Sequence, residues 1–105
     1  MTAVENIKAT IQEHITKNPI ILFMKGSPDM PRCGFSAKVV QILKSCGISF
    51  VSVDVLENPD VRQYLPEVSN WPTFPQLFVH GELIGGCDIV TELYENGELE
   101  EILGK

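Results

Sequence analysis

The sequence lacks long hydrophobic runs and a leader-like start. No apolar stretch approaches the roughly 20 residues that a membrane-spanning helix requires, and the N-terminus lacks the charged-then-apolar order of a signal peptide. We therefore expect no membrane partner and a bacterial-type cytoplasmic protein, with the mature form of an organelle-matrix protein as the alternative. The 105 residues show no repeat, linker or low-complexity segment, which predicts a single domain over residues 1–105.

Positive charge is also scarce. The chain has 8 Lys and Arg against 14 Asp and Glu, a net charge of −6, whereas binding to nucleic acid needs a basic face for phosphate contacts. We therefore expect no nucleic-acid partner. Residues 1–50 nevertheless carry six Lys and Arg against three Asp and Glu, while residues 51–105 carry two against eleven. The first half thus supplies local positive charge that the total conceals.

Cysteine is in short supply too. The three cysteines are Cys33, Cys46 and Cys87, an odd number that leaves at least one thiol outside any disulfide framework. No pair has the Cys-x-x-Cys spacing of a redox or zinc site, because Ser36 stands where a second cysteine would follow Cys33. Dithiol reduction by that route is therefore excluded, which favours a mixed disulfide with another thiol or metal ligation.

Periodicity and turn residues predict an alternating order of helices and strands. Apolar residues recur at three- and four-residue spacing after the capping box at Thr2 and again after Cys33. We expect Pro66 to shorten a third helix, His80-Gly81 to form a hairpin turn, and Asp88 to cap the last helical region. The predicted helices are 3–16, 33–47, one that starts at 58–60, and 88–103 with an interruption at 97, and the predicted strands are 20–24, 48–56, 75–79 and 82–84.

This order predicts an α/β fold with a four-stranded mixed sheet flanked by helices. The strand, helix and strand over 20–56 are expected to form a right-handed crossover between parallel strands. The apolar run 20–24 is expected to be covered on both faces.

Cys33 is the main candidate for chemistry. It begins a predicted helix directly after a strand and a loop, where unpaired backbone N–H groups and the helix dipole stabilise negative charge. Lys25 ends the preceding strand and can add a positive charge. The resulting thiolate would be both a nucleophile and a soft metal ligand. The alternative is that Cys33 is a small buried apolar residue.

Four motifs in order resemble those of the monothiol glutaredoxins. These are the extended loop from Lys25 to Ser36, the signature Cys33-Gly34-Phe35-Ser36 within it, the segment Trp71-Pro72-Thr73-Phe74-Pro75, and Gly85-Gly86-Cys87-Asp88. The similarity covers about residues 4–103 and is closest to the single-domain members. It implies a thioredoxin-like, glutaredoxin fold, which agrees with the predicted order of elements.

The resemblance implies a cis peptide bond before Pro75, with Thr73 and Phe74 opposite Cys33. A backbone exposed in this way can pair with an extended peptide such as glutathione. The alternative is an ordinary proline at the start of a strand.

The resemblance also assigns a glutathione site. Lys25 and Arg62 would meet the glycine carboxylate, Phe74 would add backbone contacts, and Cys87 and Asp88 would meet the γ-glutamyl end. Asp88 can pair with the ammonium, while the N–H groups of the helix receive the carboxylate. The alternatives are that Lys25 and Arg62 are solvated surface charges and that Asp88 is only a helix cap.

The resemblance further implies a [2Fe–2S] cluster shared between two copies of the chain. Such a cluster usually takes four thiolates, so Cys33 of each protomer and two glutathiones would complete the set. The implied function is that of a homodimeric iron–sulfur cluster carrier or scaffold in cluster biogenesis and iron homeostasis, with BolA-like proteins and apo iron–sulfur proteins as partners. Two alternatives stay open: a glutathione-dependent thiol-disulfide oxidoreductase of at most weak activity that removes glutathione from proteins through Cys33, and an interaction module in which Cys33 is inert.

The remaining candidates have simpler interpretations. Cys46 falls on the apolar stripe of its helix and is expected in the core. Cys87 either packs beside the glutathione site or forms a disulfide with Cys33 under oxidation. His14 and His80 are expected on the surface, and Trp71 in the core or at the rim of the site.

Overall fold

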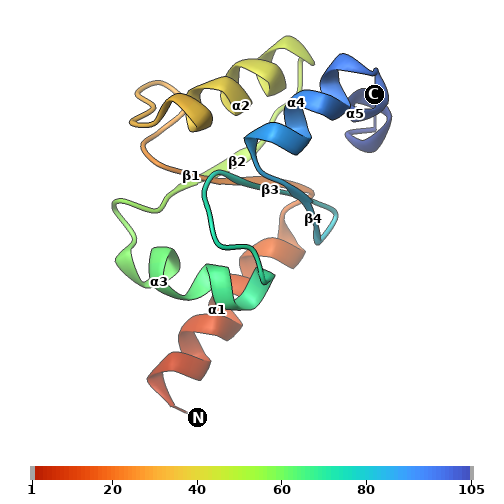
Figure 1. Ribbon diagram of the computed structural model, residues 1–105. Helices are drawn as coiled ribbons and strands as arrows, with labels where there is room; N and C mark the ends of the chain where they lie inside the picture. The colour runs from red at the N-terminus through yellow and green to blue at the C-terminus, as the bar shows by residue number, and fades with distance from the viewer. Residues whose placement is uncertain (1, 105) are drawn as a thin grey trace.

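The computed structural model describes residues 2–104 and shows a four-stranded sheet covered by helices on both faces (Figure 1). The strand order is β2-β1-β3-β4, with β1 parallel to β2 and antiparallel to β3, and β3 antiparallel to β4. This mixed sheet confirms the predicted fold class. The elements are α1 (Ala3–Lys17), β1 (Ile20–Met24), α2 (Gly34–Ser45), β2 (Val51–Asp54), α3 (Pro59–Ser69), β3 (Gln76–Val79), β4 (Glu82–Gly85), α4 (Cys87–Glu95) and α5 (Glu98–Ile102).

The two faces of the sheet bury two separate apolar clusters. Leu22 and Met24 of β1 pack into one cluster with residues of α2, α4 and α5, while Ile21 and Phe23 pack into the other with residues of α1 and α3. Figure 1 shows the same division, with α2, α4 and α5 on one side of the sheet and α1 and α3 on the other. Alternate side chains of β1 are thus buried in opposite directions, as expected for its continuous apolar run.

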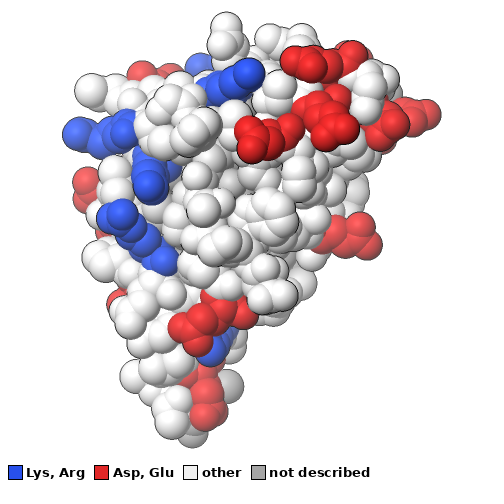
Figure 2. Space-filling model, viewed as in Figure 1, with Lys and Arg blue, Asp and Glu red and all other residues white. Residues whose placement is uncertain are grey.

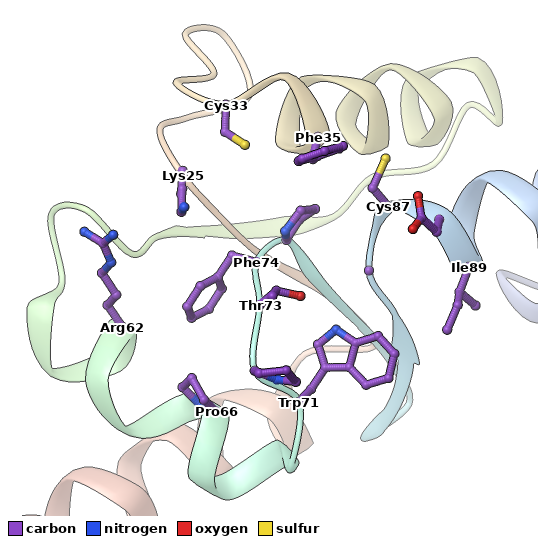
Figure 3. Close-up of a pocket in the computed structure, with 14 residues that line it drawn as sticks. Lys25, Cys33, Phe35, Arg62, Pro66, Trp71, Thr73, Phe74, Cys87 and Ile89 are labelled. Atoms are coloured by element: carbon purple, nitrogen blue, oxygen red, sulfur yellow. The ribbon is translucent and has the colours of Figure 1, made fainter.

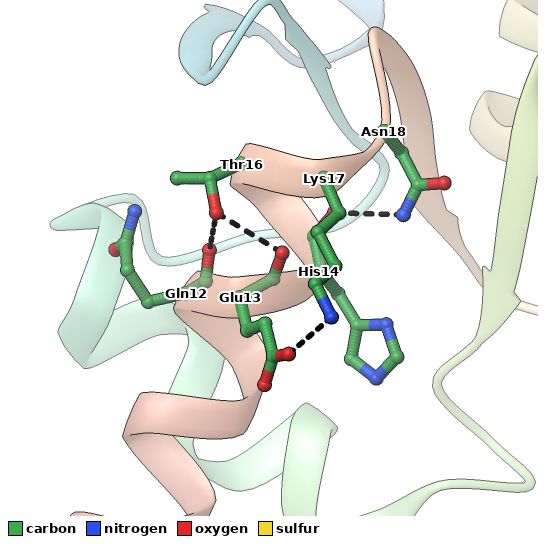
Figure 4. Close-up of polar contacts among 6 residues, drawn as sticks. All are labelled: Gln12, Glu13, His14, Thr16, Lys17 and Asn18. Carbon is green, nitrogen blue, oxygen red and sulfur yellow. Dashed lines mark hydrogen bonds and ion pairs between the residues drawn. The ribbon is translucent and has the colours of Figure 1, made fainter.

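Side chains satisfy backbone groups at both ends of α1. The Thr2 hydroxyl accepts a hydrogen bond from the Glu5 N–H at 3.1 Å, which confirms the predicted capping. At the other end, Thr16 donates to the Gln12 and Glu13 carbonyls and the Asn18 amide donates to the His14 carbonyl at 2.8 Å (Figure 4). An ion pair between Lys17 and Glu13 closes the same turn. Carbonyl groups of the last turn of α1 therefore have side-chain partners just before β1 begins.

The second predicted strand is shorter than expected. It covers Val51–Asp54 rather than 48–56, because β1 offers it only Ile21–Met24 as partners. Ile48 and Phe50 instead pack their side chains against the α2 side of the core. The length of this strand is thus set by its neighbour in the sheet and not by its own β-rich composition.

The expectation that Pro66 shortens α3 is wrong. The helix continues to Ser69 and ends at Asn70, whose left-handed backbone (φ 55°) places its N–H on the Pro66 carbonyl. An interior proline removes one N–H donor and crowds the carbonyl four residues earlier, yet the chain is helical on both sides of Pro66. The Ser69 hydroxyl also donates to the Leu65 carbonyl at 3.0 Å, so the last turn remains hydrogen-bonded.

The capping role expected for Asp88 is also wrong. Helix α4 begins at Cys87 with Gly86 as its N-cap, and Asp88 lies within the first turn. The extended backbone of Gly86 (φ −96°, ψ −161°) already starts the helix one residue earlier than expected. In that position the Asp88 carboxylate still lies at the positive end of the helix dipole.

The other boundaries agree with the sequence to within two residues. His80 and Gly81 both have positive φ, 51° and 82°, as the tight turn of the predicted hairpin requires. The predicted interruption at Gly97 separates α4 from α5. Within residues 2–104, no helix combines the length and the apolar character needed to cross a membrane.

Candidate functional site

A pocket of about 670 Å³ opens where five segments of the fold meet. It lies between the end of β1, the start of α2, one face of α3, the segment 71–75 and the start of α4 (Figure 3). All residues that the sequence singled out for catalysis or glutathione binding line it, together with six others. The expected residues are Lys25, Cys33, Arg62, Thr73, Phe74, Pro75, Cys87 and Asp88, and the others are Phe35, Pro66, Trp71, Pro72, Gly86 and Ile89.

The Cys33 thiol occupies the start of α2, as predicted. Its backbone is extended and forms the N-cap of the helix, and its side chain is partly buried. In Figure 3 its sulfur points into the pocket, with Lys25 and Arg62 to one side and Cys87 to the other. The alternative that Cys33 is a fully buried core residue is therefore excluded.

Hydrogen bonds at the helix start make Cys33 acidic. The backbone N–H of Ser36 is the main cause that holds the pKa of the Cys33 thiol below its ordinary value. Partial burial opposes this and raises the pKa, while the Phe35 N–H, the Lys25 ammonium and the Ser36 hydroxyl add to the lowering. The lowered pKa increases the fraction of Cys33 present as thiolate, the form that attacks disulfides and ligates soft metals.

Ser36 has a structural role beyond replacing a cysteine. Its side chain is fully buried, and its hydroxyl accepts a hydrogen bond from the Lys25 N–H at 3.1 Å. The residue therefore attaches the end of β1 to the first turn of α2. A second thiol at this position would be a much weaker acceptor for that N–H.

The loop between β1 and α2 is held by its own backbone. The Arg32 N–H donates to the Lys25 carbonyl at 2.9 Å, and Ser27 and Met30 exchange backbone hydrogen bonds. Gly26 lies at the base of this turn with φ 90°, and a Cβ there would come within 2.5 Å of the Met30 carbonyl oxygen. Only glycine fits the loop at this point.

The segment 71–75 forms the opposite wall. The Phe74–Pro75 bond is cis, as the resemblance implied. Gln76 has no exposed surface, and its amide donates to the Trp71 and Thr73 carbonyls at 3.0 and 3.1 Å. This buried amide fixes the path of the segment that faces Cys33. Trp71 is partly exposed and lines the pocket, which decides between its two predicted positions in favour of the rim.

The start of α4 forms the third side. A Cβ on Gly86 would lie 3.1 Å from the Pro75 carbonyl oxygen, so glycine lets this helix approach the segment 71–75 closely. The Cys87 sulfur lies 3.9 Å from the Thr91 hydroxyl, and Asp88 is exposed at the mouth of the pocket. Cys33 and Cys87 are both free thiols in this structure, and a disulfide between them stays a prediction.

The pocket has a cationic side and an anionic side. Among residues 2–104 the ion pairs are Lys8–Glu67 and Lys17–Glu13, so the charges of Lys25 and Arg62 are available to a ligand. Figure 2 shows Lys and Arg gathered over the start of α2 and the loop before it, and Asp and Glu gathered over α4 and α5. The charge asymmetry of the sequence thus becomes an asymmetry across the pocket.

Comparison with known proteins places this site in a family. The family model described as Glutaredoxin matches residues 20–84. Glutaredoxin 4 of Escherichia coli K12 is 60% identical over 93 residues, covering 89% of this chain and 81% of the relative. The probable monothiol glutaredoxin GrlA of Legionella pneumophila is 60% identical over 83 residues, covering 79% of this chain and 93% of the relative. The solution structure of reduced poplar apo GrxS14 superposes with a TM-score of 0.81 at 52% identity, covering 95% of this chain and 93% of that one.

The chain belongs to the glutaredoxin family, in its monothiol class. The order of motifs that suggested this family is therefore confirmed, and so is the fold that it implied.

Two residues that shape this glutaredoxin's pocket were not found from its sequence. The sequence predicts Gln76 only as a strand residue, although a polar side chain beside Pro75 in the run Gln76–Val79 is a signal for a buried hydrogen-bonding role. It predicts Asp54 only as part of the strand 48–56, whereas in the structure the Asp54 carboxylate accepts the Gly26 N–H at 3.0 Å. No local pattern predicts that contact, because it depends on the register between β1 and β2.

The other sequence expectations have plain outcomes. Cys46 is buried in the core, and His14 and His80 are exposed, all as expected. No group of three or more His, Cys, Asp or Glu side chains within the described part of the chain is arranged to hold a metal ion.

We expect Gly26→Ala to destabilise this glutaredoxin by about 1–3 kcal/mol, because the new Cβ would strain the positive φ and clash with the Met30 carbonyl. Urea unfolding measures the loss. The matched control is Gly34→Ala, since a Cβ at Gly34 meets no atom within 4 Å. Its effect should stay below about 1 kcal/mol. Equal effects of the two substitutions would contradict the account of the loop.

We expect the rate of Cys33 alkylation by iodoacetamide to reach half its maximum below the ordinary pKa of a thiol. Ser36→Ala should move that midpoint upwards only slightly, because the backbone N–H of residue 36 remains in place. It should also lower the free energy of unfolding by about 1–3 kcal/mol, because the Lys25 N–H loses its acceptor. Ser45→Ala, at the far end of α2, serves as control. An unshifted thiol pKa in the unsubstituted chain would refute this picture of Cys33.

Proposed function

We propose that this glutaredoxin binds glutathione beside Cys33 and carries a [2Fe–2S] cluster between two copies of the chain. The observation that carries the proposal is the Cys33 thiol, whose pKa is lowered, in a pocket whose two sides bear opposite charge. A pocket of about 670 Å³ lies within the range of small-ligand sites. The cytoplasm is the compartment that we propose for this activity.

Glutathione matches the chemistry of the pocket. At neutral pH it carries a carboxylate at each end and an ammonium group beside one of them. Lys25 and Arg62 are cations without ion-pair partners among the described residues, and they suit the glycine carboxylate. Asp88 suits the ammonium, while the free N–H groups at the start of α4 suit the γ-glutamyl carboxylate. The segment of Thr73 and Phe74 offers backbone groups for an extended peptide.

The cluster is cargo that the protein would pass on, and one chain offers too few thiolates to hold it alone. A [2Fe–2S] cluster usually takes four thiolates, and we assign one of them in each chain to Cys33, the N-cap of α2. Two protomers and two glutathiones complete the set. Two of the four ligands would then be glutathione thiolates and not protein side chains. Such a ligand set suits cluster transfer, because dissociation of glutathione lets the thiolates of another protein bind the iron. BolA-like proteins and apo iron–sulfur proteins are the partners that we propose.

A second function uses the same thiolate without a cluster. The Cys33 thiolate can attack the glutathione sulfur of a protein mixed disulfide, forming a Cys33–glutathione disulfide and releasing the protein thiolate. A free glutathione thiolate then attacks the glutathione sulfur of that disulfide, yields glutathione disulfide and regenerates Cys33. The low pKa of Cys33 favours this candidate.

We expect anaerobic reconstitution with iron, sulfide and glutathione to give a coloured dimer, followed by visible absorbance and gel filtration. Cys33→Ser should abolish colour and dimer together, and omission of glutathione should do the same. Cys46→Ala removes a thiol outside the pocket and should leave both intact. A colourless monomer under full reconstitution would contradict the carrier function, and rapid turnover of a glutathionylated protein by that monomer would favour the second one.

A further inference from the structure

Consecutive backbone N–H groups at the end of β1 are bound by side chains from two different elements. The Lys25 N–H donates to the Ser36 hydroxyl of α2 at 3.1 Å, and the Gly26 N–H donates to the Asp54 carboxylate of β2 at 3.0 Å. Lys25 is therefore held on both sides, by α2 at the Met24–Lys25 peptide and by β2 at the Lys25–Gly26 peptide. Because Gly26 has no side chain, it is bound to β2 through its backbone N–H.

The Asp54 carboxylate is itself fixed in place. Asp54 pairs with Met24 in the parallel register of β2 and β1, which brings it beside the point where the loop begins. The same oxygen that accepts the Gly26 N–H also accepts the Leu56 N–H at 2.9 Å, and the Asn58 amide donates to the Asp54 carbonyl at 2.8 Å. These bonds hold the acceptor oxygen facing the loop.

Two functional groups depend on the Lys25–Gly26 peptide. Lys25 lines the pocket, and its flexible side chain can place an ammonium reproducibly only if its backbone is fixed. The Lys25 carbonyl also accepts the N–H of Arg32 at 2.9 Å, the residue directly before Cys33. A displaced peptide would therefore move the cation and the thiol together.

We propose that Asp54, which does not line the pocket, is a positioning residue that acts through the Gly26 N–H to hold Lys25 in place for an anionic ligand. The identity of that ligand as glutathione rests on the proposed function. The neutral substitutions Asp54→Asn and Asp54→Ala separate the hydrogen bond from the charge. Asparagine keeps an acceptor oxygen at this position and alanine removes it.

The test is calorimetric titration of glutathione into the unsubstituted chain and its variants. We expect Asp54→Ala to weaken binding by about tenfold and Asp54→Asn by less than about threefold. Glu57→Ala, which removes an exposed carboxylate of the same region, should have no effect. In a Lys25→Ala background Asp54→Ala should cause less than about a twofold further loss, because residues that act through one another are not additive.

Three results would overturn the proposal: equal losses in the alanine and asparagine variants, a loss below about twofold in the alanine variant, or full additivity with Lys25→Ala. Hydrogen exchange of the Gly26 amide is a second measurement. It needs neither glutathione binding nor a folded Asp54→Ala variant. We expect at least about a hundredfold protection in the unsubstituted chain and in Asp54→Asn, and exchange at the rate of an unstructured peptide would overturn the proposal. If no form of the chain binds glutathione, the proposed function fails, and this exchange measurement still decides the role of Asp54.

Discussion

The pocket depends on how the chain leaves its first strand. The Lys25 N–H and carbonyl and the Gly26 N–H each have a partner, on Ser36, Arg32 and Asp54 respectively. These bonds place a cation at the end of β1 and a thiol at the start of α2 in the walls of the same pocket. If they were broken, the apolar core would remain and the relation between Lys25 and Cys33 would be lost.

The same arrangement explains why one cysteine suffices as a reactive group. The thiolate is stabilised chiefly by the Ser36 N–H at the start of the helix, and the hydroxyl of the same residue binds the neighbouring strand. Serine at this position thus removes a resolving thiol and adds a strong acceptor for a buried N–H. Chemistry that needs a second sulfur cannot take it from position 36 and must use Cys87, a ligand or another chain.

The sequence predicted the family, the order of elements and eight of the fourteen residues that line the pocket. Seven of these eight lie in the motifs that suggested the family, and Arg62 lies outside them. Boundaries set by tertiary partners were not predictable in the same way. The extent of β2 follows from the length of β1, and α3 continues past Pro66 to a left-handed cap at Asn70, with its last turn still hydrogen-bonded. The contact of Asp54 with Gly26 is not predictable from local sequence, because it depends on the register between β1 and β2. Gln76, by contrast, is a polar residue next to Pro75, which is a local signal for its contacts with the segment 71–75.

We propose that each chain supplies one thiolate to the cluster and that glutathione and a second chain supply the rest. Native mass spectrometry of the anaerobically reconstituted protein tests this claim by the composition of the species formed. The account predicts a complex of two chains, two glutathiones and one [2Fe–2S] cluster, which breaks into single chains when the cluster is lost. A cluster held by one chain, or by two chains without glutathione, would contradict it.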